Sequence, residues 1–263
     1  MYTEERKAEI LKLLERDGKV SVFSLAKKFK TSQETIRRDL NYLEKKGALS
    51  RTHGGAISCL VKDGVAGGII KEYPESIRRA QQQSEKQLIS AEMAGHISDG
   101  DTIYIDNSTT CLFLIDALPK DIHINVITNS IRFLYDAAQL ECENISFICI
   151  GGAFNPRNMS TYQDGMIAST LAADIFPDKC IISCAGINDK RGITDGSAYE
   201  VSQKRKYMEA ADKVYLLIDH TKIGKTGQFA LDDGSGIDCI ITDEPIDKKK
   251  LKLAKNIEVI VAK

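Results

Sequence analysis

Two short polar segments have residue types and spacings that could bind a ligand. Residues 31–40, "TSQETIRRDL", place a Thr/Ser pair before two adjacent arginines. Arginine side chains donate to phosphate oxygens and to base edges in a major groove, so this segment could bind DNA. Residues 106–110, "DNSTT", follow the apolar run "TIYI". Hydroxyls and backbone N–H groups at the start of a helix form an anion site, and phosphate is its commonest occupant.

Both segments also have an ordinary structural interpretation. In the first, Arg38 could form an exposed pair with Glu34, four residues earlier, that stabilises a helix by only a few tenths of a kcal/mol. In the second, Ser108 and Thr109 could simply cap the helix that we expect directly after Thr110. The choice depends on the elements that position these residues.

The first 58 residues predict three helices followed by a hairpin. Apolar spacing indicates helices over residues 3–15 and 22–29, with "DGKVSV" as a tight connection. A third helix should begin near residue 33 and end near Gly47. The alternating segment "ALSRTHGGAIS", residues 48–58, reads as a two-stranded wing. Together these elements predict a winged helix-turn-helix.

The third helix has a capping signal and a clear apolar side. Thr31 and Glu34 have the spacing of a capping box, and Ser32 is an alternative N-cap. An apolar stripe faces the core, Arg38 lies opposite it, and Arg37 lies on the flank. The stripe is Ile36, Leu40 and Leu43. The residues that we expect to contact DNA are Ser32, Gln33, Thr35, Arg37, Arg38, Asn41, Arg51 and His53.

The charge distribution favours nucleic-acid binding by the first part of the chain alone. The whole chain has a net charge of -1, but residues 1–60 carry +5 and residues 61–263 carry -6. A basic segment joined to an acidic body indicates that only the basic segment binds a polyanion.

Composition excludes several other classes of protein. The seven cysteines show no C-x-x-C spacing and several lie in apolar runs, so we expect buried reduced thiols in a cytoplasmic protein. The four histidines share no metal-ligand spacing, and we expect no metal and no other cofactor. We find no run of about 18 apolar residues, so we expect no membrane span.

The rest of the chain predicts a mainly parallel α/β domain. Gly-rich residues 59–72 read as a linker between a head, residues 1–58, and a body, residues 73–263. Apolar β-branched runs alternate in the body with helix-length segments such as residues 85–97 and 199–211, which is typical of a sheet covered on both faces. The runs are "TIYID", "INVIT", "ISFICI", "CIISCA", "VYLLID", "IDCIIT" and "IEVIVA".

Polar or glycine residues follow several of these predicted strands. The carboxyl ends of parallel strands meet at one edge of a sheet, so we expect their loops to converge on one pocket. Glu200 and Lys204 lie four residues apart on a predicted helix, where an exposed Glu–Lys pair is the simpler interpretation. The residues after the strands include Asn129, Ser130, Gly151, Gly152, Asp219 and Lys222.

Residues 25–56, "LAKKFKTSQETIRRDLNYLEKKGALSRTHGGA", resemble the N-terminal signature of the DeoR family of bacterial transcriptional regulators. The body is similar to the effector domain of that family in "DGDTIYIDNSTT", "TNS", "GG", the Glu–Lys pair and "DHTK". Arg78, Glu85 and Lys86 also fall where the family usually carries such residues. The departures from the family pattern are Thr31 for Val, Ser108 for Gly and Thr221 for Ser.

The resemblance implies a winged head followed by a body of the phosphosugar isomerase or CoA transferase type, which binds phosphorylated sugars or related metabolites. Ser108 places a side chain where the backbone should approach a phosphate closely. The residues that we expect to bind the effector are Asp106, Asn107, Ser108, Thr109, Thr110, Asn129, Ser130, Gly151, Gly152, Glu200, Lys204, Asp219 and Lys222.

The sequence therefore predicts a cytoplasmic, homo-oligomeric repressor, dimeric or tetrameric, that binds double-stranded operator DNA. We expect it to control a catabolic operon for a sugar or carbohydrate derivative, and to be released by a phosphorylated sugar. One alternative is a phosphosugar isomerase or deaminase with a DNA-binding head, in which Asp106, Glu200 and Lys204 would act. Another is a metabolite-binding module whose head contacts protein. No acid/base arrangement in the sequence requires catalysis.

Overall fold

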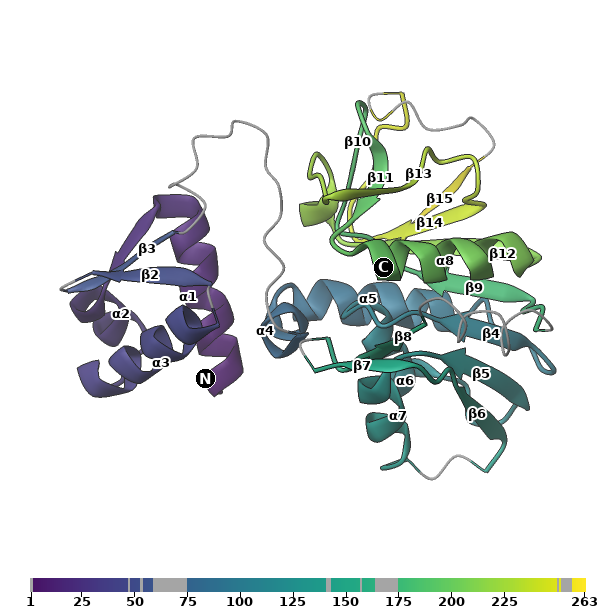
Figure 1. The fold of residues 1–263 in the computed structure, drawn as a ribbon, viewed down its shortest axis with the longest axis horizontal. Coiled ribbons are helices and arrows are strands. Elements are labelled where there is room, and N and C mark those ends of the chain that lie inside the picture. The colour runs from purple at the N-terminus through teal and green to yellow at the C-terminus, as the bar shows by residue number, and fades with distance from the viewer. Residues whose placement is uncertain are drawn as a thin grey trace. The chain divides into compact units, whose positions relative to one another are not determined.

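A computed structural model describes residues 2–46, 48–52, 54–58, 75–140, 143–156, 158–163, 175–249, 251 and 257–263. The chain divides into two compact units, Met1–Gln83 and Ser84–Lys263. The predicted linker, residues 59–72, and His53 lie outside the described residues. Figure 1 shows the fold of each unit.

The N-terminal unit is a winged helix-turn-helix, as predicted. Its three-stranded antiparallel sheet has the order β1-β3-β2, because "DGKVSV" supplies a strand in which Lys19 lies opposite Ile57 and Ser21 opposite Gly55. The elements are α1 (Thr3–Asp17), β1 (Lys19–Ser21), α2 (Val22–Lys28), α3 (Gln33–Lys45), β2 (Leu49–Thr52), β3 (Gly55–Ser58) and α4 (Glu75–Ala80).

The apolar stripe of α3 is the part of this unit that fixes its arrangement. Ile36, Leu40 and Leu43 are completely buried and belong to one core cluster with apolar residues of α1 and α2. Ser32 is the N-cap, since its side chain accepts from the backbone N–H of Thr35 at 3.1 Å. The structure therefore uses the alternative cap rather than the Thr31 capping box.

The C-terminal unit contains a seven-stranded sheet of order β15-β14-β12-β9-β4-β5-β6 in which every neighbouring pair is parallel. All seven predicted apolar runs form these strands, so the predicted fold class is confirmed. The strands are β4 (Thr102–Ile105), β5 (Ile124–Thr128), β6 (Ile145–Cys149), β9 (Lys179–Ile182), β12 (Lys213–Ile218), β14 (Cys239–Thr242) and β15 (Glu258–Val261).

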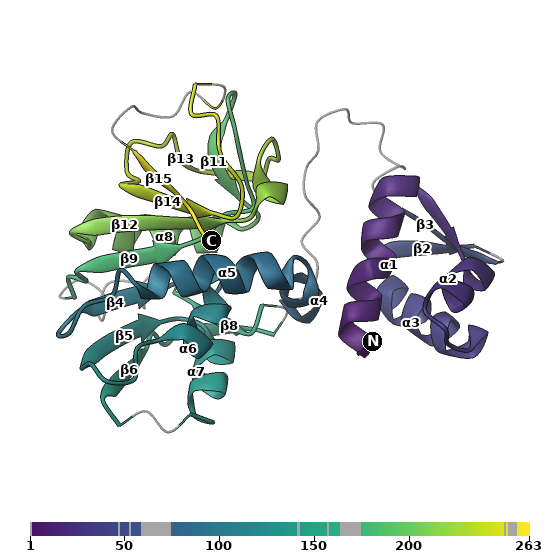
Figure 2. The same cartoon turned by 180° about the vertical axis from the view of Figure 1, so that it is seen from behind.

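Helices cover both faces of this sheet (Figures 1 and 2). Ile103 and Ile105 point into a core cluster shared with α5, α6 and α7, whereas Tyr104 between them points into a second cluster shared with α8. Alternate residues of a strand point to opposite faces, which is why doubly covered strands are continuously apolar. The helices are α5 (Gln83–Ala94), α6 (Leu114–Ala117), α7 (Ile131–Ala137) and α8 (Ala198–Ala210).

The body also contains short antiparallel elements that the sequence patterns did not predict. They are the hairpin β7 (Ala153–Asn155) with β8 (Ser160–Tyr162), and the sheet β10 (Gly186–Asn188), β11 (Gly192–Asp195) and β13 (Phe229–Asp232). The glycines after β6 lead into the hairpin. Gly152 has φ +147°, and a Cβ there would lie 2.2 Å from the carbonyl oxygen of Tyr162. The hairpin therefore requires glycine at this position.

Two expectations about the body were wrong in detail. Only a 3-10 turn, η2 (Cys111–Phe113), and the four-residue α6 follow Thr110, rather than a full helix. Cys149 is exposed, because it lies near the end of the edge strand β6. The other described cysteines are buried, and all of them are free thiols, as expected: Cys111, Cys180, Cys184 and Cys239.

Candidate DNA-binding and effector-binding sites

The N-terminal half of α3 is polar, exposed and only weakly bonded to itself. Arg37 donates to Glu34 Oε2 at 3.5 Å and to Gln33 Oε1 at 3.4 Å. The alternative in which Glu34 pairs with Arg38 is therefore not what the structure shows, since the Glu34 carboxylate pairs with Arg37 instead. Arg38 is exposed and makes no hydrogen bond or ion pair within the described residues. Both guanidinium groups are available to a partner at little energetic cost.

Arg51 joins the wing to α3. Its Nε donates to the carbonyl oxygen of Gly55 at 3.2 Å, and its Nη1 forms a short hydrogen bond to Asn41 Oδ1. The backbone N–H of Arg51 also donates to Glu44 Oε1 at 2.8 Å. Arg51 and Asn41, which the sequence treats as separate candidates, are therefore bonded to each other. This bond sets the position of β2 relative to the exposed side of α3.

Asp39 is a structural residue that sequence reasoning missed. Its carboxylate accepts from Arg6 Nε at 2.6 Å and from Arg6 Nη2 at 3.3 Å, and both side chains are largely buried. In the sequence, this structural role was indicated by the position of Asp39 on the third helix, directly before the apolar Leu40. A bidentate Arg–carboxylate pair adds geometric specificity as well as energy, so it fixes the orientation of α3 against α1.

The centre of the effector domain is a buried ion cluster. Lys204 Nζ lies 2.9 Å from Asp106 Oδ2, forms a short hydrogen bond to Asp195, and donates to the carbonyl oxygen of Ser183 at 2.8 Å. Lys204 is 3% exposed and Asp106 is completely buried. The exposed Glu200–Lys204 pair favoured by residue spacing alone is therefore wrong, because α8 turns Lys204 toward the sheet. Asp195, at the end of β11, was not predicted.

The charges in this cluster stabilise one another. Burial raises the pKa of Asp106, but the charge of Lys204 and hydrogen bonds from Ser108 and Ser183 outweigh it and leave the pKa below its ordinary value. Burial lowers the pKa of Lys204, but Asp106 and Asp195 outweigh it and raise the pKa well above its ordinary value. The cluster therefore holds one ammonium and two carboxylates.

The predicted phosphate loop lies directly after Asp106. The backbone N–H of Ser108 donates to Asp106 Oδ1 at 2.9 Å, and the Ser108 hydroxyl accepts from the N–H of Cys111 at 3.2 Å. Ser108 thus caps the 3-10 turn. Lys86 of α5 is buried and donates to the Thr109 hydroxyl at 3.2 Å, which brings a cation to the loop. An anion here would rely on this lysine, the hydroxyls and backbone N–H groups, because the following helix is too short for a large dipole.

Side chains from three different loops meet at α8, as the strand order predicts. Glu200 Oε1 accepts from Asn107 Nδ2 at 3.0 Å and from Asn158 Nδ2 at 2.7 Å. Asn129, after β5, donates to Gln203 Oε1 at 3.3 Å. The phosphate loop, the loop after β5 and the β7–β8 hairpin are therefore all tied to one helix. Asn158 and Gln203 had no signal in the sequence.

The remaining predicted effector residues have mainly structural contacts. Ser130 caps α7 by accepting from the backbone N–H of Phe133 at 3.1 Å. The carbonyl oxygen of Gly151 accepts from Gln163 at 3.2 Å. Asp219 is buried and accepts from the N–H of Thr221 at 3.0 Å, in the turn η4 (His220–Lys222). These residues shape the loops that follow the parallel strands.

Lys222 is close enough to Cys184, two residues after β9, to influence the pKa of that thiol. Burial and the charge of Asp195 raise the pKa of Cys184 to about 12, whereas Lys222 and Lys204 act in the opposite direction. Lys222 is half-buried. The loops after β9 and β12 therefore share one electrostatic environment.

One further cluster next to η4 has residue types that could bind a metal. Ligand atoms of His220, Asp243 and Glu244 lie within 4.8 Å of one another. His220 Nδ1 is 2.5 Å from Asp243 Oδ2, and the backbone N–H of His220 donates to Asp243 Oδ1 at 2.7 Å. These bonds tie the turn that carries Asp219 and Lys222 to the end of β14.

Comparison with known proteins identifies the family. The model of the DeoR C terminal sensor domain matches residues 81–244, and that of the DeoR-like helix-turn-helix domain matches residues 6–61. The chain is 31% identical over 261 residues to the HTH-type transcriptional regulator YulB of Bacillus subtilis (strain 168), covering 99% of this chain and 96% of that protein. The chain belongs to the DeoR family.

Two other DeoR-family relatives match over nearly their whole lengths. The HTH-type transcriptional regulator GolR of Listeria innocua serovar 6a is 32% identical over 257 residues, covering 96% of this chain and 95% of that protein. The lactose phosphotransferase system repressor of Streptococcus mutans serotype c is 31% identical over 260 residues, covering 99% and 100%. The chain is thus a DNA-binding transcriptional regulator, and the alternative of an isomerase or deaminase is not supported. Within the described part of the chain, no helix has the length and apolarity to cross a bilayer.

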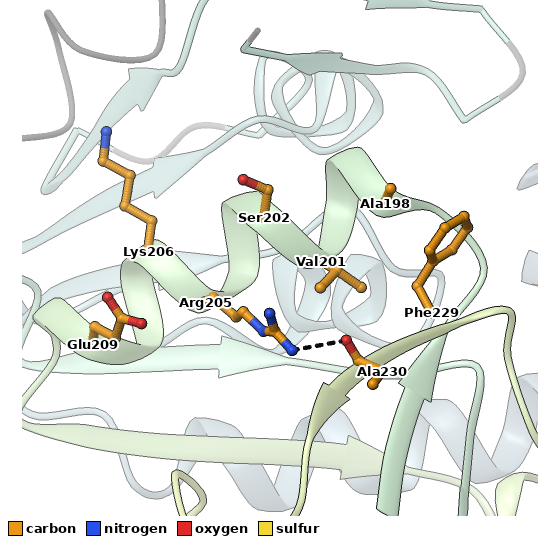
Figure 3. Close-up of a pocket in the computed structure, with 8 residues that line it drawn as sticks. All are labelled: Ala198, Val201, Ser202, Arg205, Lys206, Glu209, Phe229 and Ala230. Carbon is orange, nitrogen blue, oxygen red and sulfur yellow. Dashed lines mark hydrogen bonds between the residues drawn. The ribbon is translucent and has the colours of Figure 1, made fainter. Parts of the chain in front are cut away.

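The hollows found on the DeoR sensor domain lie on the other side of α8 from the ion cluster. One hollow, with a volume of about 470 Å³, lies between α8 and β13. It is bordered by Arg205, whose Nη2 donates to the carbonyl oxygen of Ala230 at 3.0 Å (Figure 3). At 100° per residue, Arg205 lies roughly opposite Gln203 and Tyr207 on the helix. This hollow therefore contains none of the predicted effector residues. Its lining is Ala198, Val201, Ser202, Arg205, Lys206, Glu209, Phe229 and Ala230.

Proposed function

We propose that this DeoR-family protein is a cytoplasmic repressor of a catabolic operon for a sugar or carbohydrate derivative. It binds operator DNA through α3 and the wing, and a phosphorylated sugar in the sensor domain releases it. One observation carries the proposal. Polar residues that follow separate parallel strands converge beneath α8, in a chain whose other unit exposes two arginines on a winged helix.

For DNA recognition, we assign base contacts to Arg38 and phosphate contacts to Arg37. Arg38 lies opposite the buried stripe of α3 and makes no bond within the described residues, whereas Arg37 lies on the flank. Asn41, bonded to Arg51, supports the wing beside this surface. The other proposed contacts are Ser32, Gln33 and Thr35, with Arg51 and His53 from the wing.

For effector binding, we assign the phosphate to the loop after β4, to Lys86, which contacts that loop, and to Lys222 from the turn after β12. Thr109 already accepts from Lys86, so a phosphate oxygen can replace that bond, and Lys222 adds a second charge. The buried carboxylates of Asp106 and Asp195 are compensated by Lys204, so they oppose an anion less than free carboxylates would. The sugar hydroxyls then face α8 and the loop after β5.

Release requires linkage between the two sites. The metabolite must bind the DNA-incompetent arrangement more tightly, and each tenfold change in DNA affinity needs about 1.4 kcal/mol of differential binding. One small winged helix makes few contacts, so we propose a homo-oligomer, dimeric or tetrameric, that presents two or more heads to the operator.

The experiment combines a ligand screen with DNA binding. A thermal-shift screen of phosphorylated sugars selects a compound that stabilises the folded protein by mass action. Fluorescence anisotropy with DNA from upstream of the operon then measures release. In a Thr109→Ala/Lys222→Ala variant, we expect normal DNA affinity and loss of release.

Ser202→Ala is the matched control, because Ser202 lies on the outer side of α8, and it should release normally. Normal release in the double variant would disprove the phosphate site. Failure of the wild-type protein to bind DNA would instead favour a head that contacts protein.

A further inference from the structure

The inner face of α8 contains two buried polar atoms that have no hydrogen-bond partner among the described residues. They are Nε2 of Gln203 and the hydroxyl oxygen of Tyr207, four residues later. Residues four apart lie on the same side of a helix, so both belong to the face that also carries Lys204. Tyr207 is 1% exposed and stacks on Tyr104, with ring centroids 4.0 Å apart.

The orientation of the Gln203 amide follows from its neighbours. Asn129 Nδ2 donates to the carbonyl oxygen of Thr161 at 2.9 Å. A carbonyl oxygen only accepts, so this bond fixes which end of the Asn129 amide is the donor. The same Nδ2 donates to Gln203 Oε1 at 3.3 Å, so the other end of the Gln203 amide must be its NH₂ group. The atom without a partner is therefore a donor, and it requires an acceptor.

A buried donor without an acceptor destabilises the folded protein, so its presence in a ligand-binding region is informative. Glu200, one turn earlier on the same helix, is a carboxylate and would repel a phosphate placed beside Gln203. A neutral oxygen, such as a hydroxyl or carbonyl of a sugar, satisfies the donor without that repulsion. The sugar portion of a ligand fits this position better than its phosphate.

We propose that Gln203 recognises an oxygen of the polyhydroxy portion of the effector and is a specificity-determining residue of this site. This inference rests on the proposed function, because it takes the phosphate to lie at the loop after β4. Gln203 then distinguishes a sugar phosphate from inorganic phosphate. Tyr207 supplies a second polar group for the same portion of the ligand.

The test compares two ligands in matched variants. The probes are inorganic phosphate and whichever of ribose 5-phosphate, fructose 6-phosphate, glucose 6-phosphate and glycerol 3-phosphate stabilises the wild-type protein most. Gln203→Met keeps the length of the side chain and removes the donor, and Ser202→Ala is the control on the outer side of α8. Calorimetric titration measures the Kd of the ester, and competition against it measures the Kd of inorganic phosphate.

In Gln203→Met we expect the Kd of the ester to rise tenfold or more, since the ligand oxygen loses its donor. The Kd of inorganic phosphate should change less than twofold. The Tm of the ligand-free variant should change little, because removal of the unsatisfied Gln203 donor is offset by loss of the acceptor for Asn129 Nδ2. An unchanged Kd for the ester, or a parallel loss for both ligands, would overturn the inference.

The two proposals fail in different ways. If the ester releases wild-type protein from DNA and Gln203→Met behaves like wild type, the proposed function stands and the role of Gln203 is wrong. If no ester binds the wild-type protein, the effector half of the proposed function fails, and the role of Gln203 fails with it.

Discussion

Replacing Lys204 by Met would leave two buried carboxylates without their cation. In the intact cluster, the attraction across 2.9 Å between Lys204 Nζ and Asp106 Oδ2 is about 6 kcal/mol at an effective dielectric constant of about 20. This attraction offsets desolvation that costs several kcal/mol for each ion. Removing one member of a buried pair typically costs about 3–5 kcal/mol, so we expect Lys204→Met to destabilise the sensor domain by that amount.

The loss should depend on pH in a defined direction. In the wild type the pKa of Asp106 lies below its ordinary value, so its stabilisation is present at neutral pH and is lost only as pH falls through that lowered pKa. Without Lys204, burial would raise the pKa of Asp106 above its ordinary value. The variant would then gain stability relative to the wild type as pH falls. The difference in unfolding free energy should be smaller at pH 5 than at pH 8.

Differential scanning calorimetry resolves the two units and suits a chain without tryptophan. For a domain of this size, about 3–5 kcal/mol corresponds to a decrease in Tm of roughly 6–20 °C. Lys206→Met, two residues further along α8 and in the outer hollow, is the matched control. Its effect should stay within about 0.5 kcal/mol. A decrease in Tm for Lys204→Met no larger than that of the control, or one independent of pH, would refute the reasoning.

Three other outcomes follow from the geometry. Arg38→Ala should weaken operator binding by about 1–3 kcal/mol in fluorescence anisotropy at fixed salt, and unchanged affinity would exclude a base contact. Asp39→Asn removes the negative charge and one of the two acceptor oxygens for Arg6, and should destabilise the N-terminal unit by about 1–3 kcal/mol in urea unfolding, whereas a change near zero would place the pair with ordinary surface pairs. Partial burial lowers the pKa of His220, but Asp243 outweighs it and raises the pKa above its ordinary value. The stabilisation of the folded protein by the His220–Asp243 pair is therefore complete below about pH 6.5 and is lost as pH rises through the raised pKa. Calorimetry between pH 6 and 8 should show this loss of stability in the wild type and not in His220→Asn. The same pH dependence in the variant would contradict the assignment.

The sequence was informative wherever one residue pattern had one structural meaning. A strand that is covered on both faces is apolar at most of its positions, so seven such runs could be recognised as seven parallel strands. The three-residue strands of the hairpin, by contrast, are too short to show a period of two. The divisions between head, linker and body stay predictions, because residues 59–72 lie outside the described part of the chain.

The effector site shows why spacing alone fails at buried polar positions. Glu200 and Lys204 have the same spacing as an exposed ion pair, and nothing local distinguishes the two cases. What buries Lys204 is a pair of carboxylates, Asp106 and Asp195, which reach it from elsewhere in the chain. In the head, the buried pair of Asp39 and Arg6 is likewise formed by residues that are far apart in the sequence. Such partners can be recognised only after the fold brings them together.

The charge state of Lys204 has a chemical consequence for a pocket proposed to hold sugars. An amine attacks a carbonyl carbon only through the lone pair of its neutral form, and the two carboxylates keep Lys204 as the ammonium ion. The same three donor hydrogens are directed at Asp106, Asp195 and the carbonyl oxygen of Ser183. Lys204 would therefore not attack an aldehyde or ketone bound beside it. Under the proposed function, the metabolite would then leave without having reacted with Lys204, and its concentration in the cell would be reported without being consumed.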